Sequence, residues 1–391
     1  MPRSLTPLLV ALLAMYATLQ LVVPVLAPLS RELDLSANQL GLVIAIAAVA
    51  VTLSSPLWGW LLDVAGPRTV LVAGLGLCVV GLGGFAAAVT FGLDETLTSD
   101  QAFVVVLAFR SVLLGAGLAV LPVAALAVAG IVTVDEGERT KAVGLVGAAQ
   151  GLAALAGPPI GGVLTAVSLM LPLYLAPVLA LLITAFVLVT VKPVERPQQH
   201  VPARPWELVP AFGFGFLMYL SFGLSQVVIT LLAKDRLEVG TSVAAVSGVL
   251  AASALGLVVT QGVAVPLLKW PAARLTRTGA PIALAGYAIL AVTQSVWLTA
   301  FGYLVVAVGL GFAVTGFAAA ATLGAGPERQ GLVAGLVYAV NGLAVLVGPW
   351  LSTVLYDVVP VAPLIAAGAC AALAWVVSLS TLTPRVPQSP V

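Results

Sequence analysis

The chain has 391 residues, of which 61% are hydrophobic and 8% are charged, and its mean hydropathy is +1.17. A soluble domain is about half apolar and a quarter charged, so this composition excludes a soluble protein and predicts an all-α membrane protein with many spans. The net charge of +1 indicates no particular partner. Cys78 and Cys370 lie within apolar runs, which predicts neither a disulfide framework nor a metal site. We expect no cofactor, no metal and no nucleic-acid partner.

Twelve apolar runs reach or approach the length of about 20 residues that a membrane-spanning helix needs. Lipid offers the backbone no hydrogen-bonding partner, so these runs should be helices. The first run is too long for the apolar core of a signal peptide, and we interpret it as the first span. In chain order the runs are Leu8–Leu29, Leu40–Leu62, Val70–Phe91, Phe103–Val132, Val143–Val167, Leu173–Val191, Leu208–Leu232, Val243–Leu268, Thr278–Ser295, Trp297–Leu323, Leu332–Leu355 and Val361–Leu382.

The charges between the runs predict the orientation. If the N-terminus is inside, the inside segments hold twelve Lys and Arg residues and the outside segments hold three, whereas the acidic residues divide into seven and eight. This bias of basic residues alone is the positive-inside pattern. We therefore expect a multi-pass protein of the cytoplasmic (inner) membrane with both termini in the cytoplasm.

A polar segment divides the chain near its middle. Residues 192–206 read KPVERPQQHVPARPW, with four prolines and several charges, a composition typical of a linker. The sequence thus predicts an N-terminal six-helix bundle (1–191), a cytoplasmic linker (192–206) and a C-terminal six-helix bundle (207–391). Every other loop is short, which excludes a soluble domain and with it most enzymes.

One segment occurs twice. Residues 144–158 read GLVGAAQGLAALAGP and residues 335–349 read GLVYAVNGLAVLVGP, with ten of fifteen positions identical and an offset of 191 residues between equivalent positions. Gln150 in the first copy corresponds to Asn341 in the second. The repeat predicts two homologous, pseudo-symmetric halves. Paired repeats in a membrane chain are typical of secondary transporters, which bind substrate between the repeats.

The stretch from Gly59 to Arg68, GWLLDVAGPR, resembles the signature loop of the major facilitator superfamily. The matching positions are Gly59, Leu61, Asp63, Gly66 and Arg68. In that family the acid faces the positive end of the eleventh helix, which here begins near Gly331, and the contact helps to gate the transport path. The resemblance implies this gating role for Gly59, Asp63, Gly66 and Arg68. In the alternative interpretation Asp63 and Arg68 only solvate a short turn.

The corresponding loop of the second half, residues 269–277, contains three basic residues and no acid. We therefore expect the acid-to-helix contact in the first half only.

Arg110 is the one charge well inside a predicted span. A central arginine costs about 2.5–3.5 kcal/mol on insertion scales, so a compensating role is expected. Its position resembles the fourth-helix arginine of the same superfamily, which implies a role in proton coupling or in binding substrate charge. The glycines that follow in the family at plus four and plus six are here Gly115 and Gly117, at plus five and plus seven. A purely structural arginine is the alternative.

The fifth run ends with GPPIGG. Pairs of small residues four apart let helices approach closely, and proline removes a backbone donor and kinks a helix. The motif resembles the fifth-helix motif of proton-coupled exporters in the superfamily. We predict helix hinges at Gly157, Pro158, Gly161, Gly348 and Pro349.

Polar and aromatic residues within the runs predict a substrate path. Tyr16 and Gln20 share one face of the first helix at i, i+4, and Phe212, Phe216, Tyr219 and Gln226 share one face of the seventh. In the superfamily the first, fourth, seventh and tenth helices line the path. Interhelical hydrogen bonding is the alternative for each residue. The predicted substrate contacts are Tyr16, Gln20, Gln150, Phe216, Tyr219, Gln226 and Asn341.

No Asp or Glu lies deep in a predicted span; the acids nearest to the spans are Glu32, Asp34, Asp63, Glu207 and Asp357. Proton coupling thus depends on the resemblance alone. The sequence predicts a monomeric transporter that exports small apolar or weakly polar compounds in exchange for protons by alternating access. The first alternative is uptake or exchange of a small organic anion with Arg110 as counter-charge, and the second is a receptor or scaffold that no longer transports.

Overall fold

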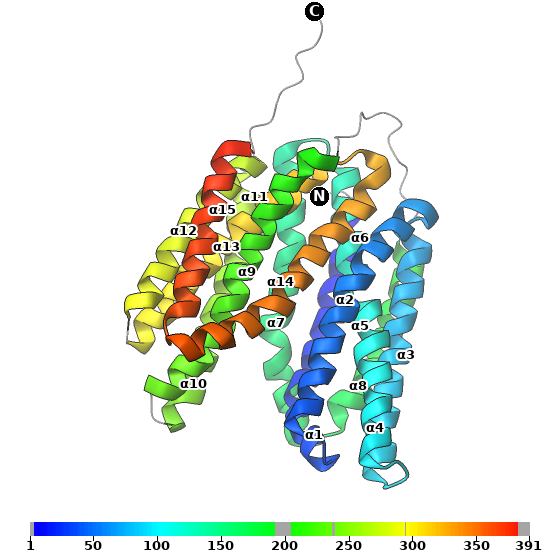
Figure 1. The fold of residues 1–391 in the computed structure, drawn as a ribbon. Coiled ribbons are helices and arrows are strands. Elements are labelled where there is room, and N and C mark those ends of the chain that lie inside the picture. Colours follow the sequence, from blue (N-terminus) through cyan, green and yellow to red (C-terminus); the bar gives the residue numbers. More distant parts are fainter. Residues whose placement is uncertain (1–3, 192–204, 237–238, 294, 382–391) are drawn as a thin grey trace, which may run out of the picture. The chain divides into compact units, whose positions relative to one another are not determined.

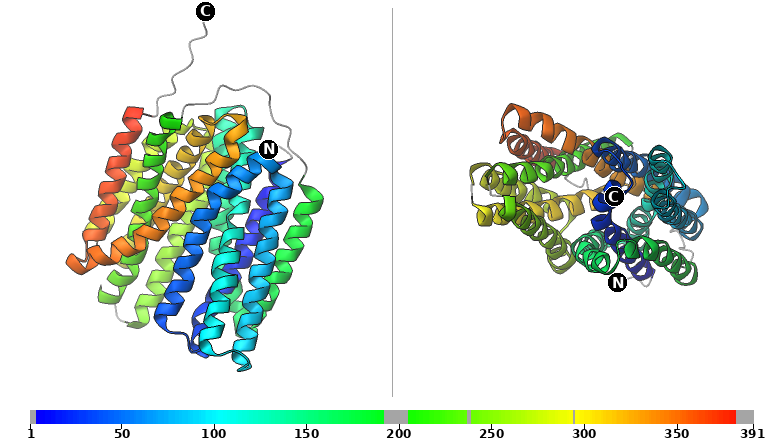
Figure 2. Two further views of the ribbon diagram at one scale, coloured as in Figure 1. Left: turned by 45° about the vertical axis from the view of Figure 1, so that its right-hand side comes forward. Right: turned by 90° about the horizontal axis from the view of Figure 1, so that it is seen from below.

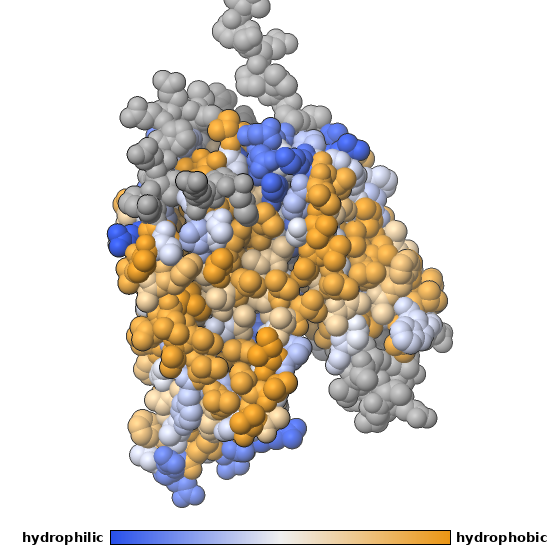
Figure 3. Space-filling view, turned by 180° about the vertical axis from the view of Figure 1, so that it is seen from behind, coloured by the Kyte–Doolittle hydropathy of each residue, from blue (hydrophilic) through white to orange (hydrophobic). Residues whose placement is uncertain are grey.

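The computed structural model describes residues 4–191, 205–236, 239–293 and 295–381, which are helical almost throughout (Figure 1). Twelve helices in this part of the chain are long and apolar enough to cross a membrane, which confirms the predicted number of spans. Apolar side chains cover the middle of the face shown in Figure 3, and hydrophilic residues gather near its ends. The predicted linker lies outside the described residues except for its last two positions, and so do both chain ends.

By their contacts the helices form two compact units, and neither unit is one continuous stretch. The first combines residues 1–134 and 145–200 with 325–346, and the second combines 135–144 and 201–324 with 347–391. The short segments 135–144 and 325–346 therefore each pack with helices of the other predicted half. The predicted division at the linker stays a prediction.

Unit 1 contains the first eight α-helices and the beginning of α14, which lie side by side in Figures 1 and 2. Helices α3 and α8 pack against each other, and α2 packs along η1 and α5. The helices are α1 (Leu5–Glu32), α2 (Ala37–Ala65), α3 (Pro67–Leu93), α4 (Ser99–Val106), the π-helix η1 (Leu107–Leu113), α5 (Leu114–Leu118), α6 (Val120–Val132), α7 (Glu136–Val167) from residue 145 on, α8 (Leu171–Thr190), the 3₁₀ turn η3 (Pro327–Arg329) and α14 (Gln330–Val358) up to residue 346.

Unit 2 contains the first turns of α7, the end of α14 and the helices between them. Helix α12 packs extensively against α13, and α9 packs against α15. The helices are α9 (Pro205–Arg236), α10 (Val239–Val259), the π-helix η2 (Thr260–Ala264), α11 (Val265–Leu268), α12 (Ala272–Val292), α13 (Val296–Leu323) and α15 (Ala362–Thr381).

Local sequence explains where several helices of unit 1 begin. The Ser36 hydroxyl accepts the Gln39 N–H while the Gln39 amide accepts the Ser36 N–H, and Thr98 and Gln101 form the same capping box before α4. Between α2 and α3 the chain turns at Gly66, whose φ of 81° favours glycine. Proline at the next position has the φ that a first helical residue needs. These signals fix the ends of α2, α3 and α4, and α2 and α3 both line the cavity described below.

Candidate functional site

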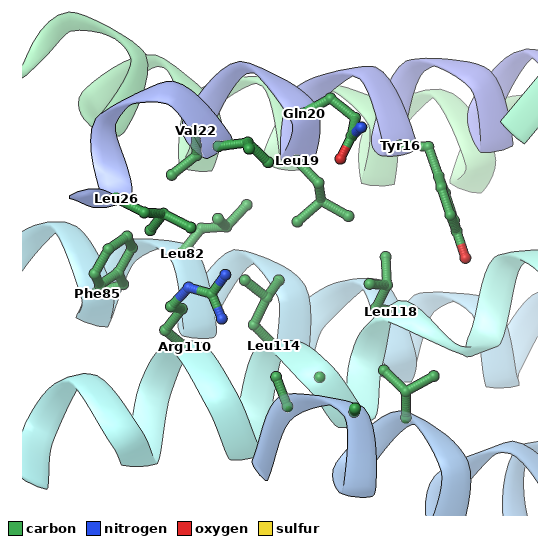
Figure 4. A pocket seen from close by; sticks show the side chains of 15 residues that line it. Tyr16, Leu19, Gln20, Val22, Leu26, Leu82, Phe85, Arg110, Leu114 and Leu118 are labelled. Atoms are coloured by element: carbon green, nitrogen blue, oxygen red, sulfur yellow. The ribbon is translucent and has the colours of Figure 1, made fainter. Parts of the chain in front are cut away.

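Unit 1 contains a cavity of about 240 Å³ between α1, α2, α3, η1 and α5. Three of the predicted site residues, Tyr16, Gln20 and Arg110, lie on its wall. Figure 4 shows the Arg110 side chain projecting from its own helix toward α1, which carries the other two. The remaining lining is Leu19, Val22, Val23, Leu26, Ala47, Ala48, Val51, Leu82, Phe85, Leu114, Gly115 and Leu118.

Arg110 lies in η1, where the backbone widens into a π-helix. A π-turn closes its hydrogen bonds over five residues and so takes up one more residue than an α-turn. This explains why Gly115 and Gly117 follow Arg110 one position later than in the family pattern. Both glycines still face neighbouring helices at close range: a Cβ atom would lie 3.0 Å from the Ala47 carbonyl oxygen at Gly115 and 2.5 Å from that of Gly74 at Gly117.

The guanidinium of Arg110 has no hydrogen-bond or ion-pair partner within the described part of the chain. The next residue of η1 is bonded to α2: the Ser111 hydroxyl donates to the Val43 carbonyl oxygen at 2.7 Å. The side chain is half-buried and also lines a small second cavity of about 20 Å³ beside Phe85. A charge with apolar neighbours in a span is costly without an opposite charge, and an anionic or strongly electron-rich group beside Arg110 would offset that cost.

Asp63, at the end of α2, caps α14. Its two carboxylate oxygens accept the backbone N–H groups of Gly331 and Leu332, each at 2.8 Å. These are among the unpaired donors of a helix start, where the dipole favours negative charge. The contact expected from the resemblance is thus present, which supports it over the simple solvated turn. The gating role itself stays a prediction.

Close backbone packing surrounds this contact. A Cβ atom at Gly59 would overlap the Gly331 carbonyl oxygen, and one at Gly335 would overlap the Ser55 carbonyl oxygen. Arg68 Nη2 donates to the Leu188 carbonyl oxygen of α8 at 3.1 Å. We call the Asp63 bonds and the Gly59–Gly331 approach the Asp63 contact.

The predicted hinge residues lie where α7 and α14 approach their neighbours. A Cβ atom at Gly157 would overlap the Gln20 side chain, and one at Gly161 would overlap the Leu21 carbonyl oxygen. Within unit 2, a Cβ atom at Gly348 would lie 2.9 Å from Gly223 of α9. Both α7 and α14 continue as helices through their prolines, Pro158 and Pro349.

The other predicted substrate contacts lie in different surroundings. In unit 1 the Gln150 amide donates to the Tyr338 hydroxyl at 3.4 Å, and Asn341 is half-buried on α14. In unit 2 Phe216 and Tyr219 are half-buried on α9 and Gln226 is exposed.

Sequence analysis missed two aromatic residues. Phe317 of α13 is 1% exposed and packs edge-to-face with Phe212 and Tyr219, at centroid distances of 5.6 and 6.4 Å. It lies in a run of small apolar residues, GFAAAATL, in which nothing but its size distinguishes it. Tyr338 could have been found as the one tyrosine inside the repeated segment.

A further site that the sequence did not predict is in unit 2, where the first turn of α7 meets the start of α12. Glu138 Oε1 accepts from Lys269 Nζ at 2.6 Å, and Glu136 Oε1 accepts the Ala272 N–H at 2.8 Å. The hydrogen bond with Glu138 raises the pKa of Lys269 above its ordinary value, so the ammonium stays charged. The loop of residues 269–277 supplies no acid to this contact; the acid is Glu136 of α7, which lies in the first half of the chain. That the acid-to-helix gate is one-sided stays a prediction.

Comparison with known proteins agrees with this architecture. The family described as Major Facilitator Superfamily matches residues 8–211. The chain is similar to multidrug resistance protein 1 of Bacillus subtilis (strain 168), 28% identical over 57% of this chain and 56% of that protein. It is also similar to multidrug resistance protein 2 of the same strain, 27% identical over 41% of this chain and 37% of that protein. The matches thus span little more than half of the first relative and less of the second.

Solved structures of low sequence identity share the fold. The human organic anion transporter MFSD10 (TETRAN) has a TM-score of 0.77 at 16% identity, covering 96% of this chain and 99% of that one. A variant of the E. coli fucose:proton symporter FucP has a TM-score of 0.74 at 15% identity, covering 95% of this chain and 97% of that one. With a family match over more than half of the chain, this protein belongs to the Major Facilitator Superfamily of membrane transporters and is not an enzyme.

Proposed function

We propose that this transporter exports small apolar or weakly polar compounds by alternating access. The proposed substrate class is supported by the composition of the unit 1 cavity, in which twelve of the fifteen lining residues are apolar or glycine. Ligand sites are typically apolar with a few placed polar groups. Here Tyr16, Gln20 and Arg110 are those groups. The names of the two Bacillus relatives, multidrug resistance proteins, support the same class.

Alternating access is supported by the way α7 and α14 divide between the units. Helix α7 belongs to unit 2 up to residue 144 and to unit 1 from residue 145 on. Helix α14 belongs to unit 1 up to residue 346 and to unit 2 from residue 347 on. The glycines of the repeat allow the close approaches at both ends of these helices. In this proposal the Asp63 contact forms and breaks once in each cycle, and Gly157, Pro158, Gly161, Gly348 and Pro349 absorb the bending.

Protons are the proposed coupling ion. The cavity wall contains no acid, so the titrating group would lie among the peripheral acids, of which Asp63 has the clearest contact. The support is the GPPIGG run and its resemblance to exporters that exchange substrate for protons. The proposal also places the protein as a monomer in the cytoplasmic membrane, with both termini inside.

Exchange or uptake of a small organic anion is the second candidate. It is favoured by the Arg110 guanidinium, which has no acidic partner within the described residues and faces the cavity. An anion bound there would offset the cost of the charge. Tyr16 and Gln20 could donate further hydrogen bonds to a carboxylate.

Transport into proteoliposomes separates the two candidates. A lipophilic dye and a series of monocarboxylates are supplied with and without a pH gradient, using the unchanged chain, Arg110→Lys and Arg110→Ala. Dye movement that needs the gradient supports the first proposal. Carboxylate transport that is retained in Arg110→Lys and lost in Arg110→Ala, without dye movement, overturns it in favour of the second.

A further inference from the structure

Two arginines at the start of α12 carry charges that no described acid neutralises. Residues 269–277 contain three basic side chains, of which Lys269 pairs with Glu138 at 2.6 Å. Arg274 and Arg277 form no ion pair within the part of the chain that the structure describes. Helix α12 contains no Asp or Glu of its own. Both guanidiniums therefore lie at the end of a membrane span without an acidic partner among these residues.

An aromatic stack within unit 2 holds Arg274. Its Cζ atom lies 4.0 Å from the centroid of the Trp270 ring, within the range of a cation–π contact. Trp270 in turn stacks on Phe312 of α13, with ring centroids 5.9 Å apart, and Phe312 is 8% exposed. A cation–π contact uses none of the five N–H donors of a guanidinium. The stack thus orders the charge and leaves its donors available.

Arg277 is held by the neighbouring helix. Its Nε donates to the Ser378 carbonyl oxygen of α15 at 3.3 Å, which uses one donor of the five. Side chains three positions apart on a helix are neighbours, with Cβ atoms about 5–6 Å apart, so Arg274 and Arg277 can bind one anion together. Guanidinium groups match the oxygens of a phosphate in geometry as well as in charge.

The surface that continues from these arginines along the span is apolar. On α12 it consists of the exposed side chains Ala285, Ala288 and Val292, which lie on the same helix face as Arg274. Helix α15 runs beside α12 (Figure 1) and exposes Leu373 and Val376 by 53% and 59%. Exposed apolar surface along a span meets the acyl chains of the bilayer. A phosphate site at the end of such a surface has the arrangement of a phospholipid, with its headgroup at the arginines.

We propose that Arg274 and Arg277 bind the phosphate of an anionic glycerophospholipid whose acyl chains lie along α12 and α15. Two guanidiniums favour a headgroup with net negative charge over one in which an ammonium group cancels the phosphate. Basic side chains at a membrane surface attract anionic lipid, each by about a fivefold gain in affinity. The site lies entirely within unit 2, and it depends neither on the transported compound nor on the direction of transport.

Native mass spectrometry of the purified full chain in detergent tests the site. Phosphatidylglycerol is titrated, and the fraction of chains with one bound lipid gives an apparent Kd. Arg274→Ala and Arg277→Ala should each raise this Kd by about fivefold, and the double variant by about 25-fold. Arg329→Ala is the matched control, because Arg329 is exposed, is predicted to lie on the same side of the membrane and forms no described ion pair. It should leave the Kd unchanged.

Two further ligands identify the source of the phosphate. Phosphatidylcholine should bind more weakly than phosphatidylglycerol, and an excess of inorganic phosphate should not displace the lipid. Equal binding of the two lipids, or an equal loss in Arg329→Ala, overturns the proposal. Displacement by inorganic phosphate also overturns it, since the arginines would then form a site for a soluble anion.

A measurement in a bilayer complements the one in detergent. In nanodiscs, adding phosphatidylglycerol to phosphatidylcholine should raise the melting temperature of the unchanged chain and of Arg329→Ala, but not that of the double variant. An equal rise in all three chains would show a general effect of the bilayer and would contradict a site at Arg274 and Arg277.

Discussion

Asp63 accepts the backbone N–H of Gly331 at 2.8 Å, although the two residues are 268 positions apart in the chain. A carboxylate here satisfies two donors at once and lies at the positive end of α14. Space for it exists only because Gly331 has no side chain, since a Cβ atom there would lie 2.8 Å from Asp63 Oδ1.

Asp63→Asn should therefore lower stability and transport. The amide keeps one acceptor but loses the charge and the second acceptor, a loss of about 1–2 kcal/mol for a half-buried charged hydrogen bond at a helix start. The melting temperature in detergent and transport in proteoliposomes measure the two effects. Asp94→Asn is the control, because Asp94 is exposed and makes no described side-chain bond. Equal losses in both variants would show that the effect is one of net charge.

The GPPIGG run offers a comparison between two adjacent glycines. Gly161→Ala should destabilise the protein by about 1–3 kcal/mol, the usual cost of overpacking, because its Cβ would overlap the Leu21 carbonyl oxygen. Gly162→Ala meets nothing within 4 Å and should be neutral or slightly stabilising, since alanine favours a helix. Thermal melting and transport of the two variants decide this. A loss at Gly162 as large as at Gly161 would contradict the packing argument.

The π-helix that carries Arg110 predicts an unusual tolerance to deletion. Removing Val112, which is 46% exposed, should let η1 close as an α-helix with both flanking parts kept in register. Removing Val128 from the regular helix α6 should rotate every residue on one side of the deletion by about 100° and prevent folding. Expression level and elution as a single peak in size-exclusion chromatography measure this. The result would be negative if both deletions behaved alike.

Orientation can be tested with exposed positions of unit 1. The positive-inside pattern places Asp94 outside and Glu328 inside. Asp94→Cys should thus react with an impermeant maleimide in intact cells, whereas Glu328→Cys should react only after the membrane is opened. Reversed labelling would invert the predicted topology and, with it, the side on which the Asp63 contact closes.

The sequence predicted the number of spans and the partner of Asp63 but not the details around Arg110. Twelve spans follow from length and apolarity alone, because lipid requires helices. The Gly331 partner followed from the resemblance of the loop from Gly59 to Arg68 to the signature loop of the superfamily. The π-turn was not predictable, since shifting a hydrogen bond by one residue leaves no trace in an apolar composition. The only sign of it was the late position of Gly115 and Gly117.

The ion pair of Glu138 with Lys269 was not predictable for another reason. The residues are 131 positions apart, and each belongs to a charged stretch that hydration alone would explain. Phe317 was overlooked because helices inside a membrane bundle are apolar all round, so the pattern does not distinguish the face that packs from the face that meets lipid.

The exchange of segments 135–144 and 325–346 bears on synthesis as well as on transport. The first turns of α7 leave the ribosome long before Lys269, Ala272 and Thr322 have been made. Until then the charged side chains of these α7 turns are hydrated or bound to other groups. In unit 1, Asp63 cannot accept the N–H groups of Gly331 and Leu332 until α14 emerges. The packing of unit 1, which contains most of the N-terminal half, is therefore complete only after α14 has been translated.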